Sequence, residues 1–276
     1  VCTGKDVLLF AVPSVFVRST TAKARPYIPD GQIIVDVAKG MEPETLYTMT
    51  EVIADELGKE DGPKNVKLVA LSGPTHAEEV ALDLPTTIVS ACPDDEAARF
   101  VQDVFSNTCM RVYTNADIKG VELSGALKNV IALGVGISTG LGYGDNARAA
   151  LITRGIAEIA RLGVAMGCNI HTFAGLAGIG DLIVTATSMH SRNNRAGILI
   201  GKGESPEQAV KEVGMVVEGI NALPAAMELA ARYNVEMPIV QTVNAIVKEG
   251  MSASDALRTL MDRNRKNEMP QGYEKV

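Results

Sequence analysis

The sequence predicts an α/β fold: part of a doubly wound parallel sheet over residues 1–114, followed by an all-helical C-terminal domain over residues 115–276. Three observations lead to this prediction. Short β-branched runs alternate with helix-compatible segments in the first half, and long periodic stretches rich in Ala, Leu, Ile and Gly follow from about Asn115. The chain is 46% hydrophobic but only 4% aromatic, and it has 26 glycines. We therefore expect a core of small aliphatic residues in which backbones approach closely.

Each strand is predicted from a short apolar run. Runs that are continuous and rich in β-branched residues suit strands buried on both faces of a parallel sheet. Pro13, Gly40 and Gly73 follow the first three runs, where turns should lie. The predicted strands are residues 7–12 (VLLFAV), 33–37 (IIVDV), 66–71 (VKLVAL), 86–90 (TTIVS) and 110–113 (MRVY).

The helices are predicted from 3.6-residue periodicity. In residues 149–163, Ile152, Ile156, Ile159 and Gly163 recur on one face, which is typical of an amphipathic helix. The other predicted helices are residues 94–105, 206–213, 222–233, 240–248 and 253–263, the last with Ser252 as its N-cap.

Residues 142–147 (GYGDNA) match the G-x-G-x-x-A dinucleotide fingerprint in spacing only. That fingerprint needs a preceding strand, whereas residues 123–135 favour a helix, so we interpret 142–147 as a glycine-rich interhelical turn. No G-x-G-x-x-G occurs elsewhere in the sequence. In a doubly wound sheet the phosphate-binding loop belongs to the first strand–helix unit, and this chain opens with a strand that normally comes later. We therefore expect the sequence to be truncated at its N-terminus.

Charge and composition argue against nucleic acid, metal and membrane as partners. The formal net charge is −7 with a pI near 5.1, and no basic run could neutralise a phosphate backbone. The four cysteines form no C-x-x-C pair and the three histidines are scattered, which indicates no zinc site and a reducing compartment. The longest apolar runs stop short of the ~18 residues of a membrane span, and no signal peptide opens the chain. The sequence predicts a cytoplasmic protein.

Three segments place polar groups in apolar surroundings. Lys39 follows a strand, at the edge where open α/β sheets bind ligands, and Lys128 and Asn129 interrupt an apolar helix. Taken singly, each lysine could be a surface residue with a buried stem, Asp181 an N-cap and Arg192 a solvated charge. Together they could supply an anion site and a proton-transfer group. The segments are residues 37–40 (VAKG), 123–130 (LSGALKNV), and 178–182 (GIGDL) with 191–193 (SRN).

Seven motifs occur in a fixed order along the chain: VLLFAVPS, VAKGME, LSGPTHAEEVA, GALKNVIALGVGISTGLGYGDNARAALITRG, GLAGIGDLIVTATS, SRNNRAG and VEGINA. Together they resemble the NAD(P)-dependent glycerol-3-phosphate dehydrogenases of the bacterial type, from Val7 to about Tyr233. The resemblance implies a Rossmann-type domain, NAD or NADP as cofactor, and reversible reduction of dihydroxyacetone phosphate to sn-glycerol 3-phosphate for glycerophospholipid synthesis. It also implies a homodimer, and a G-x-G-x-x-G in the segment expected before Val1.

The resemblance also assigns roles to single residues. It makes Lys128 the catalytic acid/base, which also contacts the substrate, and it gives Lys39 contacts to both substrate and cofactor. It places Asp181 against the substrate, and Arg192 at the substrate phosphate and near the cofactor. The further substrate contacts that it implies are Gly73, Thr75, Ser191 and Asn193, and the further cofactor contacts are Ala77, Val216 and Glu218.

The reaction explains why a lysine is expected. Adding hydride to a ketone puts negative charge on the carbonyl oxygen, so an adjacent ammonium stabilises the transition state and donates the proton. In the reverse direction Lys128 must accept a proton, which requires a pKa below that of an exposed lysine. Burial or a neighbouring cation such as Lys39 would lower this pKa, and an ionised Asp181 close by would oppose the shift.

Within the matched motifs one residue departs from the family pattern, and two alternative functions accompany the resemblance. Thr75 keeps a hydroxyl where the family also accepts Ser, and Asn194 replaces Arg in the SRNRR form, which leaves open whether a second Arg assists the phosphate. The chain could instead be another two-domain dehydrogenase of the hydroxyacid or 6-phosphogluconate type. Because the phosphate-binding loop is missing, it could also be a non-catalytic binding or oligomerisation module. The choice between NAD and NADP stays open, because the residue that reads the 2′ position is expected before Val1.

Overall fold

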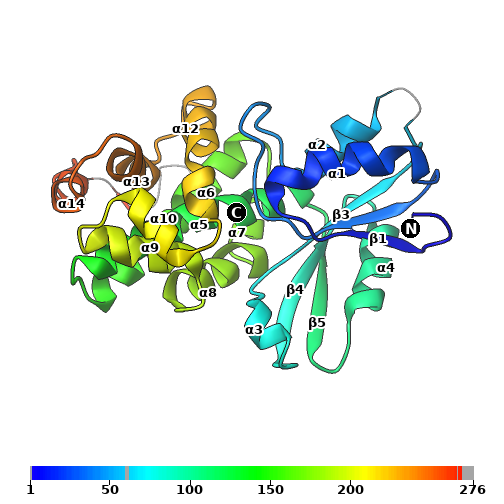
Figure 1. Cartoon of the computed structure of the whole chain (residues 1–276), viewed down its shortest axis with the longest axis horizontal. Helices are drawn as coiled ribbons and strands as arrows, with labels where there is room; N and C mark the ends of the chain where they lie inside the picture. Colours follow the sequence, from blue (N-terminus) through cyan, green and yellow to red (C-terminus); the bar gives the residue numbers. More distant parts are fainter. Residues whose placement is uncertain (1, 60–61, 266, 269–276) are drawn as a thin grey trace.

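The computed structural model describes residues 2–59, 62–265 and 267–268, which form a sheet half and a helical half (Figure 1). The last strand, β5 (Met110–Asn115), leads directly into the long helix α5 (Ile118–Gly140). The change of pattern near Asn115 therefore falls at the junction between the two halves.

The sheet has five strands in the order β1-β2-β3-β4-β5. The first three strands are parallel and β4 is parallel to β5, but β3 and β4 are antiparallel. The parallel-dominated sheet confirms the predicted fold class, whereas the antiparallel pair was not predicted. Between β3 and β4 the chain forms only the four-residue helix α3 (Ala77–Val80), not the long crossover helix that usually joins parallel neighbours. The other strands are β1 (Val7–Phe10), β2 (Ile33–Asp36), β3 (Lys67–Ser72) and β4 (Thr86–Ala91).

Helices cover both faces of the sheet (Figure 1). On one face, α1 (Val17–Ala24) and α2 (Met49–Leu57) bury side chains against β1 and β2. On the other face, α4 (Asp95–Phe105) packs through Ala97, Ala98 and Val101. Short 3₁₀ turns at Ser14–Phe16 and Arg25–Tyr27 flank α1.

The helical half is built around α5, whose residues 120–138 are all buried. Its start packs onto the sheet, because Val121 shares a core cluster with Ala70 of β3 and Val89 of β4. The remaining helices are α6 (Asp145–Ala165), α7 (Ile170–Phe173), a π-helical turn (Leu176–Gly180), α8 (Asp181–Thr187), α9 (Arg192–Gly201), α10 (Pro206–Val213), α11 (Glu218–Asn221), α12 (Leu223–Arg232), α13 (Pro238–Lys248) and α14 (Ala253–Met261).

All six predicted helices are present, with small shifts at their ends. Ser252 caps α14 as predicted, since its side chain accepts a hydrogen bond from the backbone of Asp255. Residues 142–147 lie at the junction of α5 and α6, which confirms the interhelical turn.

Glycines bring α5 and α9 into close contact. A Cβ atom at Gly136 would lie 2.2 Å from the carbonyl oxygen of Asn194, and one at Gly197 would lie 2.2 Å from that of Leu133. Gly140 and Gly201 repeat this arrangement one turn further along. The glycine-rich composition therefore lets two backbones touch, as the sequence predicted.

Two helical stretches, Ile118–Gly140 and Ile170–Thr187, are long and apolar enough to cross a membrane. The uninterrupted apolar runs within these stretches are nevertheless short, as expected from the sequence, because charged residues such as Lys128 and Asp181 interrupt them. The most apolar part of the first stretch is fully buried within the protein, as in a core helix. The second has non-helical backbone at Gly178, with φ −90° and ψ −106°.

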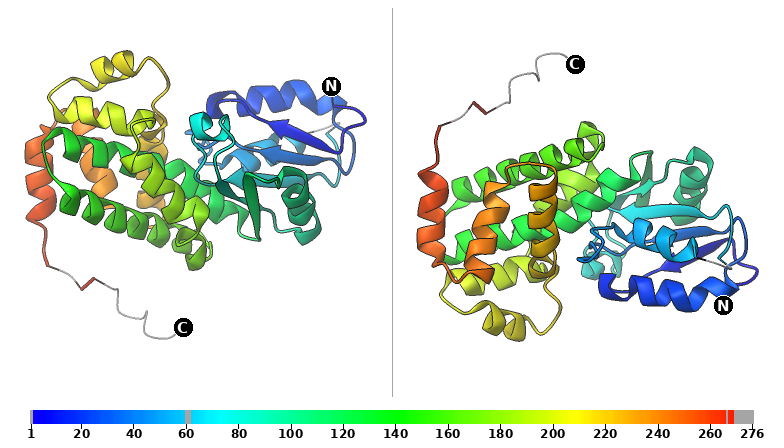
Figure 2. Two further views of the ribbon diagram at one scale, coloured as in Figure 1. Left: turned by 90° about the horizontal axis from the view of Figure 1, so that it is seen from below. Right: turned by 90° about the horizontal axis from the view of Figure 1, so that it is seen from above.

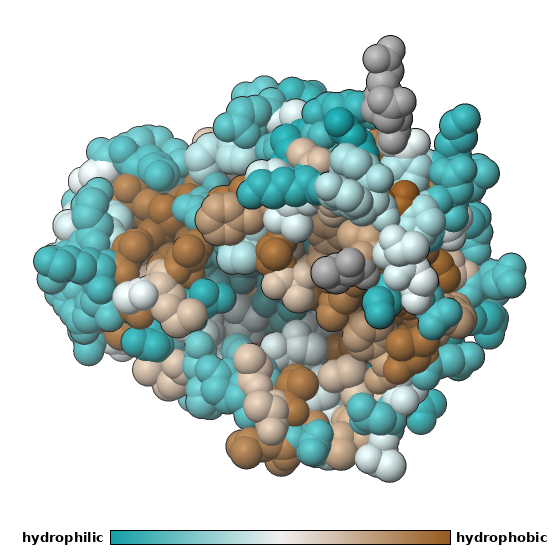
Figure 3. Space-filling model, turned by 45° about the vertical axis from the view of Figure 1, so that its right-hand side comes forward, coloured by the Kyte–Doolittle hydropathy of each residue, from teal (hydrophilic) through white to brown (hydrophobic). Residues whose placement is uncertain are grey.

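The surface of the sheet half mixes apolar and charged side chains. Leu9, Val15, Phe16 and Tyr27 are exposed there. Figure 3, in which this half is turned forward, shows apolar patches between hydrophilic ones and a hollow near the centre of the face. At the opposite end, α14 is the element farthest from the sheet (Figure 2).

Candidate active site

The central candidate residues meet where the two halves join. Lys39 follows β2 and Gly73 follows β3, so both lie at the carboxyl ends of neighbouring parallel strands. Lys128 lies in the middle of α5, and Asp181 is the first residue of α8. The edge of the sheet where open α/β folds bind ligands thus faces two charged residues of the helical half.

Asp181 joins the two lysines. Its Oδ1 lies 2.7 Å from Lys128 Nζ, and its Oδ2 lies 2.7 Å from Lys39 Nζ. Lys39 Nζ also donates a hydrogen bond of 2.9 Å to the carbonyl oxygen of Gly73. The cluster carries two positive charges and one negative charge, so it keeps a net positive charge that can attract an anion.

Burial makes this cluster unusual. Lys128 is 4% exposed and Asp181 is 2% exposed, whereas Lys39 is half-buried. Lys128 is therefore not a surface residue with a buried stem. Gly180 occupies the N-cap position of α8 and Asp181 is the first helical residue, so Asp181 is not an N-cap either.

The surroundings lower the pKa of Lys128. Burial is the largest cause and the charge of Lys39 is the next, and together they bring the pKa to about 8 against the opposing effect of Asp181. Burial acts to raise the pKa of the Asp181 carboxyl, but Lys39 and Lys128 outweigh it and hold that pKa below its ordinary value. A lysine with a pKa near 8 can both donate and accept a proton near neutral pH.

Thr185 belongs to the same cluster and was not predicted. Lys128 Nζ donates a hydrogen bond to its hydroxyl, which in turn lies 3.4 Å from Asp181 Oδ1. Thr185 follows Asp181 by one helical turn in α8, so the two side chains share one face. That spacing is the signal in the sequence that could have identified it.

A second group of hydrogen bonds holds α9 and α11 against α5. Asn193 Nδ2 donates to Asn129 Oδ1 at 3.0 Å, and Asn193 Oδ1 accepts a hydrogen bond of 2.8 Å from the backbone of Gly219. Gly219 follows Glu218 in α11. The asparagine that interrupts the apolar helix α5 thus fixes two segments that carry candidate site residues.

Ser191 and Arg192 begin α9. The Ser191 hydroxyl is buried and caps the helix by accepting a hydrogen bond from the backbone of Asn194. Arg192 is half-buried, and its positive charge acts on Glu218, whose carboxylate also accepts hydrogen bonds from Ser14. Burial raises the pKa of Glu218, while Ser14 and Arg192 act to lower it. Arg192 is therefore not a solvated charge remote from the site.

Asn194 has a structural role. It is buried, and its amide donates a hydrogen bond of 2.7 Å to the carbonyl oxygen of Ala186, which ties the start of α9 to the end of α8. The departure from SRNRR therefore places an interhelical contact, rather than a second cation, at this position.

Three predicted site residues lie at the surface. Thr75 is exposed, and its hydroxyl donates to the carbonyl oxygen of Gly73 at 3.2 Å. Ala77 and Val216 are also exposed. Their roles rest on the resemblance alone.

A cavity of about 250 Å³ opens beside the charged cluster. Ser14 follows β1, and Lys39 and Gly40 follow β2, so the cavity lies at the carboxyl edge of the sheet; Glu218 closes it from the helical half. Hydroxyl, ammonium and carboxyl groups around one cavity at this edge fit part of a dinucleotide. Within the described residues, no three His, Cys, Asp or Glu side chains are grouped so as to hold a metal ion.

Fold and site together define a two-domain oxidoreductase of the dinucleotide-binding class. Two family models match the chain, described as the NAD-dependent glycerol-3-phosphate dehydrogenase N-terminus, over residues 1–98, and C-terminus, over residues 117–258. The chain belongs to the family of NAD-dependent glycerol-3-phosphate dehydrogenases.

The relatives agree with this assignment. The chain is 68% identical to glycerol-3-phosphate dehydrogenase (NAD(P)+) 2 of Lactobacillus delbrueckii subsp. bulgaricus, a match that covers 97% of this chain and 80% of the relative. It is 54% identical to the glycerol-3-phosphate dehydrogenase (NAD(P)+) of Fusobacterium nucleatum, over 96% and 78% of the two chains. The crystal structure of glycerol-3-phosphate dehydrogenase from Coxiella burnetii superposes with a TM-score of 0.88 at 36% identity, covering 94% of this chain and 78% of that one.

Proposed function

We propose that this protein catalyses the reversible NAD(P)-dependent reduction of dihydroxyacetone phosphate to sn-glycerol 3-phosphate, the backbone precursor of glycerophospholipids. The observation that carries the proposal is the buried Lys128–Asp181–Lys39 cluster at the junction of the two halves. The substrate is inferred from the family to which the chain belongs, and this cluster contains the acid/base group that the reaction needs.

In the proposed mechanism, Lys128 is the catalytic acid. The bound cofactor supplies the hydride. As the carbonyl carbon of the substrate is reduced, the Lys128 ammonium stabilises the negative charge on the oxygen and transfers a proton to it. Asp181 holds the ammonium in place through its 2.7 Å contact, and in the oxidative direction neutral Lys128 takes the proton from the substrate hydroxyl.

The substrate and cofactor contacts follow the family motifs. The Arg192 guanidinium donates hydrogen bonds to the dianionic phosphate. Charge-assisted hydrogen bonds of this kind are stronger than those between neutral groups. The remaining proposed substrate contacts are Lys39, Gly73, Thr75, Asp181, Ser191 and Asn193, and the proposed cofactor contacts are Lys39, Ala77, Arg192, Val216 and Glu218.

A turnover assay tests the proposal. The full-length protein, given NADH or NADPH, should oxidise the cofactor with dihydroxyacetone phosphate and reduce it again with glycerol 3-phosphate. Turnover with a hydroxyacid or with 6-phosphogluconate instead would favour the alternative dehydrogenase class. A full-length protein that turns over none of these substrates would fit a binding module and would contradict the proposal.

We further propose that the protein acts in the cytoplasm as a homodimer, without nucleic-acid contact and without insertion into a membrane. The net charge of −7 supports the absence of nucleic acid, and the full burial of the apolar part of α5 supports the absence of membrane insertion. The dimer is supported by a groove of about 1470 Å³ on the helical half, whose lining includes residues of α6, α13 and α14 and none of the charged cluster.

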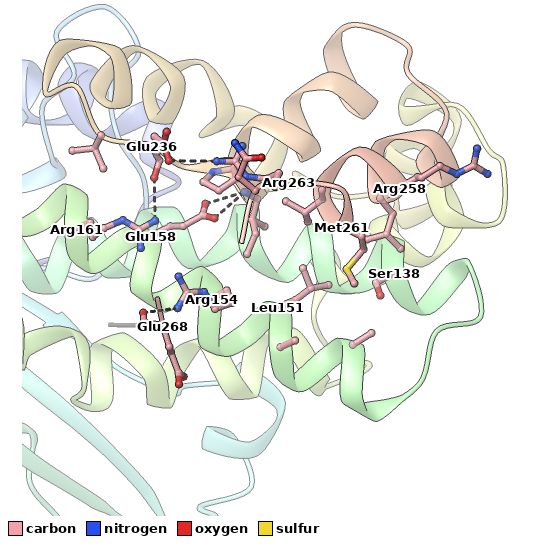
Figure 4. A pocket seen from close by; sticks show the side chains of 18 of the residues that line it. Ser138, Leu151, Arg154, Glu158, Arg161, Glu236, Arg258, Met261, Arg263 and Glu268 are labelled. Atoms are coloured by element: carbon pink, nitrogen blue, oxygen red, sulfur yellow. Dashed lines mark hydrogen bonds and ion pairs between the residues drawn. The ribbon is translucent and has the colours of Figure 1, made fainter. Parts of the chain in front are cut away.

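The groove has the composition of a self-complementary face. Its lining is mainly apolar, and the side chains of Tyr143, Val164 and Met261 remain exposed there. Its rim carries both signs of charge: Figure 4 shows Arg161 and Arg263 directed at Glu236. Under a two-fold axis, the same patch of a second copy would cover the apolar lining, and the charged residues would form the polar rim of the interface.

A further inference from the structure

Two histidine rings meet across the junction of the two halves. His76 lies in the segment after β3, and His190 lies in the turn before α9. Their ring centroids are 5.9 Å apart with an interplanar angle of 58°. This is the tilted geometry of an interacting aromatic pair, whose centroids lie about 4.5–7 Å apart.

His190 is fixed to the segment that starts α9. Its backbone N–H donates to the Ser188 hydroxyl at 3.1 Å, and the backbone N–H of Ser191 donates to the carbonyl oxygen of Ser188 at 3.2 Å. The residue after this turn is Arg192, the first of α9. His190 therefore lies in the same short segment as Ser191 and Arg192, which are proposed to bind the phosphate.

His76 is fixed to the sheet half in a similar way. Its carbonyl oxygen accepts hydrogen bonds from the backbone of Glu79 and Val80, as the N-terminal residue of α3. It directly follows Thr75, whose hydroxyl is bound to Gly73. The ring thus lies between Thr75, a proposed substrate contact, and Ala77, a proposed cofactor contact.

The His76 ring carries a polar atom without a hydrogen-bond partner. Its Nε2 atom is shielded from solvent and makes no hydrogen bond within the described part of the chain. Shielding a polar atom without a partner costs free energy, so such an arrangement needs a compensating gain. Contact with the His190 ring from the other half is the interaction that the structure offers.

We propose that His76 and His190 are positioning residues that fix the distance between segment 73–77 and segment 191–193. The Lys39–Asp181 ion pair joins the two halves at the reacting end of the substrate, and the histidine pair would join them at the phosphate end. Ser14 of the sheet half also donates hydrogen bonds to Glu218 of the helical half, so the histidine pair adds a contact at the segments that carry the proposed substrate-binding residues and helps the phosphate and the carbonyl reach their partners together. This inference rests on the proposed function.

The test compares variants of the full-length enzyme. With His190→Ala or His76→Ala, the KM for dihydroxyacetone phosphate should rise about 3- to 10-fold while kcat changes less than about 2-fold, because substrate alignment is lost and the acid/base group stays. His190→Phe should restore most of the KM, since a ring replaces a ring. The double alanine variant should resemble each single variant, as expected for one shared contact. The control is His171→Ala, which changes the remaining, exposed histidine.

The outcomes separate this inference from the proposed function. A wild-type enzyme that does not turn over dihydroxyacetone phosphate overturns both. If the enzyme is active but its alanine variants keep the wild-type KM, only the proposed role of the histidine pair is overturned. Additive effects in the double variant, or a failure of His190→Phe to restore the KM, would overturn that role as well. Thermal unfolding of each variant shows whether it is folded. If an alanine variant is unfolded, the KM of His190→Phe still tests the inference.

Discussion

At the scale of single residues, the chemistry of the site depends on how three charges share a buried space. Burial and Lys39 lower the pKa of Lys128, and Asp181 raises it. Removal of Asp181 would leave Lys128 more easily deprotonated, whereas removal of Lys39 would have the opposite effect. One carboxylate and two ammonium groups can thus set the pKa of a proton donor near the pH at which it works.

The first prediction concerns pH. Reduction needs the protonated Lys128 and oxidation needs the neutral form, so kcat for reduction should fall, and kcat for oxidation should rise, as pH increases through about 8. In Lys39→Gln, the pH at which kcat falls for reduction and the pH at which kcat rises for oxidation should both increase, because a neighbouring cation is lost. The measurement is kcat at saturating substrate in both directions, between about pH 6 and 10. If the two pH profiles of Lys39→Gln matched those of the wild type, Lys39 would have no influence on the titrating group.

Removal of Lys128 should separate chemistry from binding. Lys128→Ala should lower kcat at least ~10²-fold, the low end for loss of a general acid, with nearly unchanged cofactor affinity. Lys128→Arg should not restore activity, because a guanidinium keeps its proton and has a wider shape. Steady-state kinetics and cofactor titration measure both effects. If Lys128→Ala kept more than about a tenth of kcat, Lys39 would become the candidate acid.

Arg192 should act on substrate binding. Arg192→Ala should raise the KM for dihydroxyacetone phosphate, with a penalty of about 2–4 kcal/mol for the lost phosphate contact. Arg195→Ala, an exposed arginine in the same helix, is the matched control and should leave the KM unchanged. Equal effects of the two variants would show that only the general charge of α9 matters.

At the scale of secondary-structure elements, the close contact of α5 and α9 positions Lys128 and Asn129 relative to Arg192 and Asn193. Gly197→Ala would add a Cβ atom 2.2 Å from the carbonyl oxygen of Leu133. Because this neighbour is backbone, we expect the free energy of unfolding to fall by about 1–3 kcal/mol, as in other overpacked sites. Urea denaturation gives the value. Gly144→Ala is the control, since a Cβ atom there meets nothing within 4 Å and φ is negative. Equal stabilities would refute the tight contact.

At the scale of the whole molecule, the dimer prediction depends on the groove of the helical half. Val164→Arg and Met261→Arg place charges on its exposed apolar residues and should convert a dimer to a monomer in sedimentation velocity. Leu82→Arg, at an exposed apolar residue that does not line the groove, should leave the dimer intact. A monomeric wild-type protein, or dimers in all three variants, would exclude this face as the interface.

The sequence was sufficient to predict the five strands and most of the longer helices in their order along the chain, because each depends on local periodicity and turn residues. It also determined which residue types stand in the site motifs, so Lys39, Lys128 and Asp181 could be named as candidates. The division of the chain into domains 1–114 and 115–276, and the roles of single residues, remain predictions. The absence of membrane insertion also remains a proposal, because two helical stretches are long and apolar enough to cross a membrane although charged residues interrupt them.

The assembly of the site could not be predicted from the sequence, because it depends on contacts between distant segments. The antiparallel direction of β4 depends on the short connection after β3, and the contact of His76 with His190 depends on how the two halves pack. The pKa of Lys128 depends on burial by α5 and on charges from Lys39 and Asp181, which lie far from it in sequence. Periodicity is set by neighbours along the chain, whereas burial and electrostatics are set by neighbours in space, and only the folded protein brings those together.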